Sequence, residues 1–145
     1  MTKVERSIWI NAPGEAVNAV TLDGRRLPEW FAGIEKAEPD GVYPEPGGKV
    51  KMVYKAAGAT FNLTLTALEL VRGKHATFRM EGMITGTNHW DYTPENNGTR
   101  VSATYDYEMP GGALGKVADK LVVERTNTKN LEKSLEALKA LVEGG

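Results

Sequence analysis

The C-terminal part of the chain constrains the fold most, because it lacks the residues that end helices. Residues 113–143 contain no proline and a single glycine, Gly115. A helix over this range is about 45 Å long at 1.5 Å per residue, enough to cross a small sheet. A helix in water is stabilised mainly by packing of its apolar face, so this one needs an extended partner.

The segments before this helix alternate between apolar and polar residues, which is typical of half-buried strands. Turn-forming sequences separate several of them, at Gly58, Arg72-Gly73-Lys74 and Asn96-Asn97-Gly98. Such a run of strands and turns predicts an antiparallel meander. The clearest alternation lies in residues 4–10, 50–55, 61–67, 78–81, 90–92 and 101–107.

Two short helices are expected after the first strand, over residues 15–22, with Pro13 in the first turn, and over residues 26–31. Together these elements predict an α+β fold, in which a curved antiparallel sheet of about seven strands wraps around the long C-terminal helix. The chain has 145 residues and no internal repeat or linker. We therefore expect residues 1–145 to form one domain.

The predicted terminal helix has an apolar face that polar residues interrupt. Glu124 and Thr128 fill its middle. A buried, unpaired glutamate costs several kcal/mol, so either solvent reaches this turn, or the helix covers a cavity where Glu124 or Thr128 meets the polar end of a ligand. At 100° per residue the apolar side contains Leu114, Val117, Leu121, Leu131, Leu135, Leu138 and Val142.

Composition excludes several function classes. Lys and Arg number 18 against 19 Asp and Glu, so the near-neutral charge predicts no nucleic-acid partner. The chain has no cysteine, which excludes disulfides and thiolate chemistry. The longest uncharged stretch, residues 56–68, is too short to span a membrane. Without an apolar leader segment we expect a cytoplasmic protein; the sequence does not predict an oligomeric state.

Catalytic and metal-binding motifs are not evident. The two histidines, His75 and His89, have no metal-ligand spacing. His89 and Asp91 share one face of a strand and could form an acid–base pair, but they lie opposite Trp90, so we expect both in solvent. No serine lies in a nucleophile motif. We predict no catalytic residue, no metal site and no cofactor. The lysines at 49, 51 and 55 are expected on a solvated outer face.

Aromatic and methionine residues gather on the predicted inward faces. Each of them alone is most simply a core residue. Together they favour a cavity, because tyrosine and tryptophan carry polar tips that need partners. The candidate ligand-binding residues are Trp30, Met52, Tyr54, Phe61, Leu63, Phe78, Met80, Trp90, Tyr92, Tyr105 and Tyr107, with Val117, Leu121, Glu124 and Thr128 of the terminal helix.

Both ends of the chain resemble the START-like, or SRPBCC, superfamily, in its polyketide cyclase/dehydrase branch. Residues 8–17 (IWINAPGEAV) and 27–30 (LPEW) resemble its opening strand and helices, and residues 107–116 (YEMPGGALGK) and 123–139 its last strand and helix. The resemblance implies a helix-grip fold with a hydrophobic cavity between sheet and terminal helix. Relatives bind lipids, polyketides, plant hormones or quinones, some are aromatase/cyclases, and no catalytic motif is universal.

Three hypotheses follow. The first is binding or transport of a hydrophobic small molecule (a lipid, polyketide or aromatic compound) in the cavity, without catalysis. The second is a polyketide cyclase or dehydratase that moves protons with Glu124, a tyrosine or Arg6. The third is an interaction module that uses the fold as a scaffold. We expect the first.

Overall fold

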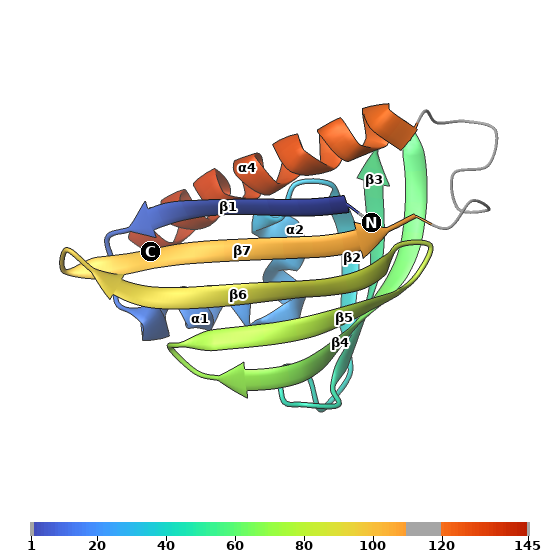
Figure 1. The fold of residues 1–145 in the computed structure, drawn as a ribbon. Helices are drawn as coiled ribbons and strands as arrows, with labels where there is room; N and C mark the ends of the chain where they lie inside the picture. The colour runs from blue at the N-terminus through green and yellow to red at the C-terminus, as the bar shows by residue number, and fades with distance from the viewer. Residues whose placement is uncertain (1, 110–119, 145) are drawn as a thin grey trace.

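The computed structural model describes residues 2–109 and 120–144 (Figure 1). Within these residues the fold is the α+β arrangement that the sequence predicts, with the 3-10 helix η1 as an addition. The elements in chain order are β1 (Thr2–Ile10), α1 (Gly14–Thr21), η1 (Gly24–Arg26), α2 (Leu27–Trp30), β2 (Ile34–Pro39), β3 (Lys49–Ala56), β4 (Ala59–Val71), β5 (His75–Gly82), β6 (Thr85–Glu95), β7 (Gly98–Glu108) and α4 (Lys120–Gly144).

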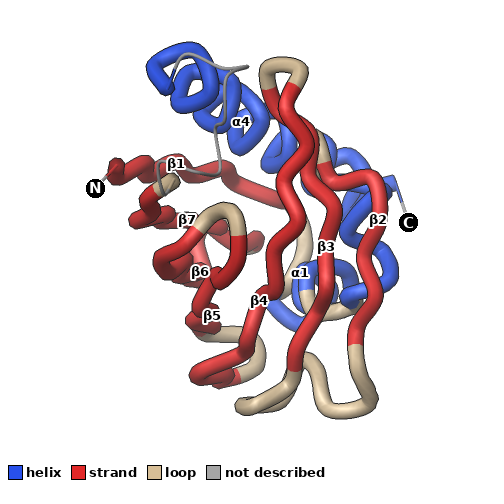
Figure 2. Tube along the Cα trace, turned by 90° about the vertical axis from the view of Figure 1, so that its right-hand side faces the viewer, coloured by secondary structure: helices blue, strands red, loops and turns tan. Residues whose placement is uncertain are grey.

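The strands of the described chain form one seven-stranded antiparallel sheet in the order β1-β7-β6-β5-β4-β3-β2. Strands β2 to β6 each pair with the next strand in sequence, and β7 pairs on its other side with β1. The sheet is strongly curved, and α1 and α2 connect its two edge strands while α4 lies across the open side (Figures 1 and 2). The concave face therefore encloses a space that α4 covers.

Two tight turns in the meander form where the sequence predicts them. Asn96 and Asn97 both have positive φ, 47° and 64°, and join β6 directly to β7. Ala57 and Gly58, with φ of 53° and 80°, join β3 to β4 in the same way. Positive φ at both central positions is the hairpin turn whose twist matches that of the flanking strands. The helix α1 spans Gly14–Thr21 instead of the expected residues 15–22, and Pro13 is its N-cap residue and not part of its first turn.

The curvature of the sheet depends on irregular positions within the strands. Strand β4 is 13 residues long and shifts register against β5 between Ala67 and Glu69. Such bulges bend a strand and increase its twist. Gly86 of β6 has a φ of 142°, and a Cβ there would collide with the backbone of Asp106 in β7. Only glycine therefore allows this close approach of the two strands.

The strand faces follow the predicted alternation. The inner face carries the core, of which Phe61 is completely buried. Lys49, Lys51 and Lys55 are exposed on the outer face, as expected. The inward register that alternation predicts for the middle strands is therefore correct.

Helix α4 presents a different row of residues from the one that hydrophobicity alone predicts. Leu131, Leu135 and Leu138 are buried as expected. Leu121 is 52% exposed, so its predicted inward position is wrong. Leu114 and Val117 lie outside the described residues, and Val142 is half-buried. The buried row also holds Val123, Asn130 and Ser134.

Candidate functional site

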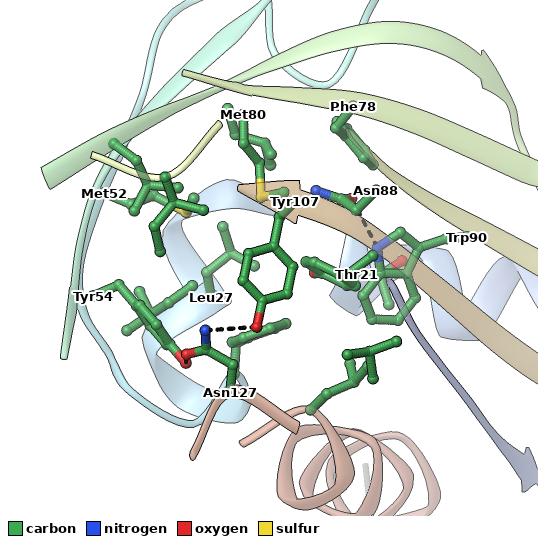
Figure 3. Close-up of a pocket in the computed structure, with 18 of the residues that line it drawn as sticks. Thr21, Leu27, Met52, Tyr54, Phe78, Met80, Asn88, Trp90, Tyr107 and Asn127 are labelled. Atoms are coloured by element: carbon green, nitrogen blue, oxygen red, sulfur yellow. Dashed lines mark hydrogen bonds between the residues drawn. The ribbon is translucent and has the colours of Figure 1, made fainter. Parts of the chain in front are cut away.

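A cavity of about 100 Å³ lies between the concave face of the sheet, α2 and α4 (Figure 3). Most of its wall is aliphatic, aromatic or methionine. Residues from β1, α2 and every strand from β2 to β7 contribute to it, and α4 closes one side with Asn127 and Leu131. Trp30 and Trp90 meet edge to face, with ring centroids 5.8 Å apart, the arrangement that aromatic pairs prefer.

Ten of the fifteen candidate residues line this cavity. Phe61 is buried beside Tyr54, with ring centroids 6.2 Å apart, but lies behind the lining. That the ten residues bind a ligand stays a prediction. They are Trp30, Met52, Tyr54, Leu63, Phe78, Met80, Trp90, Tyr92, Tyr105 and Tyr107.

Of the candidates from the terminal helix, the three that the structure describes, Leu121, Glu124 and Thr128, do not line the cavity. Val117 lies outside the described residues, and Leu121 is largely exposed. The Glu124 carboxylate accepts a hydrogen bond of 2.6 Å from the hydroxyl of Thr2 at the start of β1. The Thr128 hydroxyl donates to the backbone carbonyl of Glu124 within the helix. Glu124 does not need a ligand as its hydrogen-bond partner, because the Thr2 hydroxyl already donates to it and its side chain is only half-buried.

The polar residue of α4 that lines the cavity is instead Asn127 (Figure 3), and Asn130 is buried beside it without being part of the lining. Asn130 Nδ2 donates to the Tyr54 hydroxyl at 3.0 Å, and Tyr54 donates to Asn127 Oδ1 at 2.7 Å. Asn127 Nδ2 then donates to the Tyr107 hydroxyl at 3.0 Å. Hydrophobic periodicity missed these two asparagines because it scores amides as outward-facing. Helical spacing could have identified them. Asn127 and Asn130 each lie four residues before Leu131 and Ser134, and therefore on the same face of the helix.

A second polar group lies elsewhere on the cavity wall. The hydroxyls of Thr21 and Tyr92 are 3.2 Å apart, and Asn18 Nδ2 donates to Thr21 from behind the lining. Trp90 Nε1 donates to Asn88 Oδ1 at 3.1 Å. Thr21 and Asn88 are not among the residues predicted from the sequence. The Thr21 hydroxyl and Asn88 Oδ1 are already paired, and these hydrogen bonds position the rings of Tyr92 and Trp90.

The titratable groups on the described lining are tyrosines, and no Asp, Glu, His, Lys or Arg accompanies them. Burial raises the pKa of Tyr54 and of Tyr92 to about 12. Burial also raises the pKa of Tyr105 and of Tyr107. These phenols are therefore protonated at neutral pH, and the cavity offers hydrogen bonds without a formal charge.

The remaining candidate chemistry lies outside the cavity. His89 Nε2 and Asp91 Oδ1 are 3.1 Å apart on the outer face of the sheet, where both side chains are exposed. The Arg6 guanidinium is also exposed and pairs with Glu132 at 2.8 Å. Among residues 2–109 and 120–144, no group of His, Cys, Asp or Glu is arranged to hold a metal ion. None of the described helices is long and apolar enough to cross a membrane.

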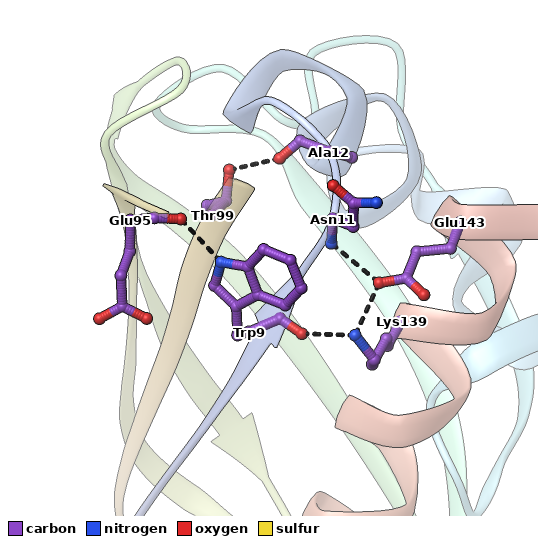
Figure 4. A network of polar contacts seen from close by, with 7 residues as sticks. All are labelled: Trp9, Asn11, Ala12, Glu95, Thr99, Lys139 and Glu143. Atoms are coloured by element: carbon purple, nitrogen blue, oxygen red, sulfur yellow. Dashed lines mark hydrogen bonds and ion pairs between the residues drawn. The ribbon is translucent and has the colours of Figure 1, made fainter. Parts of the chain in front are cut away.

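Polar contacts fasten α4 over the cavity. Near its C-terminal end, Lys139 Nζ donates to the backbone carbonyl of Trp9 at 2.8 Å and pairs with Glu143 (Figure 4). Glu143 in turn accepts from the backbone N–H of Asn11. In its middle, Ser134 Oγ accepts from the backbone N–H of Ala32 at 2.8 Å. Together with the Thr2–Glu124 bond, these contacts hold the helix at both ends and its centre.

Comparison with solved structures shows how widely this arrangement occurs. The TTHA0849 protein of Thermus thermophilus is 26% identical, with a TM-score of 0.81 over 99% of this chain and 98% of that one. The Zhui aromatase/cyclase of Streptomyces sp. R1128 shares the fold at 17% identity, with a TM-score of 0.77 over 98% and 93% of the two chains. The CV1439 protein of Chromobacterium violaceum does so at 20% identity, with a TM-score of 0.74 over 99% of each chain.

A search of curated proteins finds no match. The sequence matches one family over residues 1–143, which is nearly its whole length. The helix-grip architecture and the aromatase/cyclase among its structural neighbours agree with that match. The chain therefore belongs to the family described as polyketide cyclase / dehydrase and lipid transport.

Proposed function

We propose that this protein binds a hydrophobic small molecule in the cavity between the sheet and α4. The observation that carries the proposal is the cavity wall, which is apolar and aromatic except for a few hydrogen-bonded groups. Ligand sites commonly have this composition, with a few polar groups to orient the bound molecule. The family description, which includes lipid transport, supports the proposal.

The volume of the cavity limits the size of a ligand that can bind without rearrangement of the protein. A cavity of about 150 Å³ with apolar walls binds benzene in another protein. The cavity here, at about 100 Å³, suits a molecule of about one aromatic ring. A polyketide or a lipid chain fits only if the side chains of α4 that cover the space, such as Asn127, move away.

The three tryptophans provide the test. Trp30 and Trp90 line the cavity, whereas Trp9 donates its indole N–H to the carbonyl of Glu95 outside it. Ethylbenzene, titrated into ¹⁵N-labelled protein, is expected to shift the indole N–H signals of Trp30 and Trp90 and leave that of Trp9 in place. Equal shifts of all three signals, or none, would refute cavity binding.

A matched pair of variants on β4 localises the effect. Leu65 lines the cavity, whereas Leu68 on the same strand is exposed. Leu65→Phe adds volume inside the cavity and is expected to abolish the ethylbenzene shifts. Leu68→Phe adds the same atoms at the surface and is expected to leave them unchanged.

A polyketide cyclase or dehydratase is the second candidate, favoured by the family description and by the fold shared with the Zhui aromatase/cyclase. Such an enzyme needs groups that move protons. The described lining offers only tyrosine hydroxyls for this, since Glu124 bonds Thr2 and Arg6 bonds Glu132. Glu124→Gln is therefore expected to change neither ligand affinity nor any turnover of a polyketide substrate. Loss of turnover with unchanged affinity would favour the enzyme.

A further inference from the structure

The hydrogen bonds on the α4 side of the cavity run in one direction. Asn130 donates to Tyr54, Tyr54 donates to Asn127, and Asn127 donates to Tyr107. The Tyr54 hydroxyl thus both accepts and donates. The Tyr107 hydroxyl accepts from Asn127, and no acceptor for its own proton is present among the described residues. Within the part of the protein that the structure describes, this series of hydrogen bonds therefore ends in an unused donor, the Tyr107 hydroxyl.

That donor is buried and belongs to the cavity wall. Tyr107 is only 4% exposed and lines the cavity. Hydrogen bonds in such a chain polarise one another, so the terminal O–H is a better donor than an isolated phenol. The indole N–H of Trp30, on the same wall, is also buried without a partner. A buried donor without an acceptor costs about 1–3 kcal/mol. The cavity is therefore expected to favour a ligand that supplies a hydrogen-bond acceptor.

The lack of charged groups on the described cavity lining further narrows the class of ligand. The described lining contains no cation to pair with a carboxylate or phosphate and no carboxylate to pair with an ammonium group. The acidic group that acts on Tyr107 is Glu124, which contributes to raising the pKa of that tyrosine. Its negative charge acts against an anionic guest. Glu124 is hydrogen-bonded to Thr2 and is not part of the cavity wall, so it would not form an ion pair with a cationic ligand.

We infer that the cavity selects an uncharged apolar molecule carrying a hydrogen-bond acceptor, such as a ketone, which accepts a hydrogen bond from the Tyr107 hydroxyl. This inference rests on the proposed function and specifies its ligand class. Fatty acids and other ionised amphiphiles are rejected because their charge would be buried without a partner.

Four probes built on one benzene ring separate these requirements: acetophenone, ethylbenzene, benzoate and 1-phenylethylammonium. Each is titrated at pH 7 into the wild-type protein, with the Trp30 and Trp90 indole signals as the readout and Trp9 as the internal control. We expect acetophenone and ethylbenzene to bind. We expect each ion to bind at least tenfold more weakly than acetophenone, and an ion that binds less than tenfold more weakly overturns the inference.

The variant Tyr107→Phe removes the donor together with the hydrogen bond that the hydroxyl accepts from Asn127, and that loss affects both probes alike. We expect it to weaken acetophenone about fivefold, the effect of one hydrogen bond, while ethylbenzene binds as before. Comparing the two probes within each protein cancels their different hydrophobicities. Tyr92→Phe is the matched control, because that hydroxyl already pairs with Thr21, and it is expected to change both affinities alike.

The outcomes distinguish this inference from the proposed function. If neither neutral probe shifts the Trp30 and Trp90 signals, the proposed function fails. If both bind and Tyr107→Phe weakens them equally, the function stands and the inference fails. The comparison of ions uses only the wild-type protein, so the inference stays testable even if a variant does not fold.

Discussion

The inward face of α4 can be tested with two adjacent valines. Val123 is completely buried, whereas its neighbour Val122 is 46% exposed on the other side of the helix. Both sit in the same turn of α4, so Val→Ala at each position has the same effect on the unfolded chain and on helix propensity. The difference between the two variants therefore reports burial alone.

The magnitude follows from the two carbon atoms that the substitution removes. At about 0.8 kcal/mol per buried methylene-sized group, Val123→Ala loses about 1.6 kcal/mol of transfer free energy. The space left behind adds to this, so the free energy of unfolding is expected to fall by about 2–3 kcal/mol. Val122→Ala is expected to stay within about 0.5 kcal/mol of the wild type, because alanine also favours the helix.

Urea unfolding at 25 °C, followed by circular dichroism, measures both values. With a slope of about 2 kcal/mol per molar, Val123→Ala lowers the midpoint by about 1–1.5 M, and the slope itself is unchanged. An equal loss in both variants, or a larger loss at Val122, would show that α4 is rotated from the position described here. Asn127 would then not face the cavity.

Two further predictions concern the buried tyrosines and the curvature of the sheet. The pKa of Tyr54 and of Tyr92 is about 12 in the folded protein and about 10 in the unfolded chain. The stability from keeping them neutral is therefore complete below pH 10 and is lost as the pH rises to 12, by about 2–3 kcal/mol for each tyrosine. Urea midpoints that stay constant from pH 9 to 12 would contradict this. Gly86→Ala is expected to cost about 3 kcal/mol or more, because its Cβ collides with the β7 backbone. Gly41→Ala, where a Cβ meets no atom within 4 Å, is expected to change the melting temperature little; similar losses in the two glycine variants would refute the close strand approach.

Local patterns were sufficient to predict the sheet. A strand buries every second residue, so alternation around Met52 or Trp90 identified the inner face without knowledge of the partner strand. The Asn96-Asn97 turn is likewise a local property, because asparagine tolerates the positive φ that both positions adopt. The long terminal helix followed from the absence of helix breakers, although residues 113–119 lie outside the described structure.

The part of the site contributed by α4 could not be predicted in the same way. Glu124 and Asn127 are both polar, and nothing local distinguishes the one that bonds Thr2 at the rim from the one that joins two tyrosines. That choice depends on hydroxyl groups supplied by β3 and β7, which are distant in sequence.

The sequence by itself determined the order of elements, the inner faces of the strands and the aromatic character of the interior, because each depends on neighbours a few residues apart. Only the tertiary structure decided which row of α4 covers the cavity, how much space remains there and that Tyr107 has a proton to donate. These properties depend on pairing between side chains that meet only when the sheet has curved around the helix.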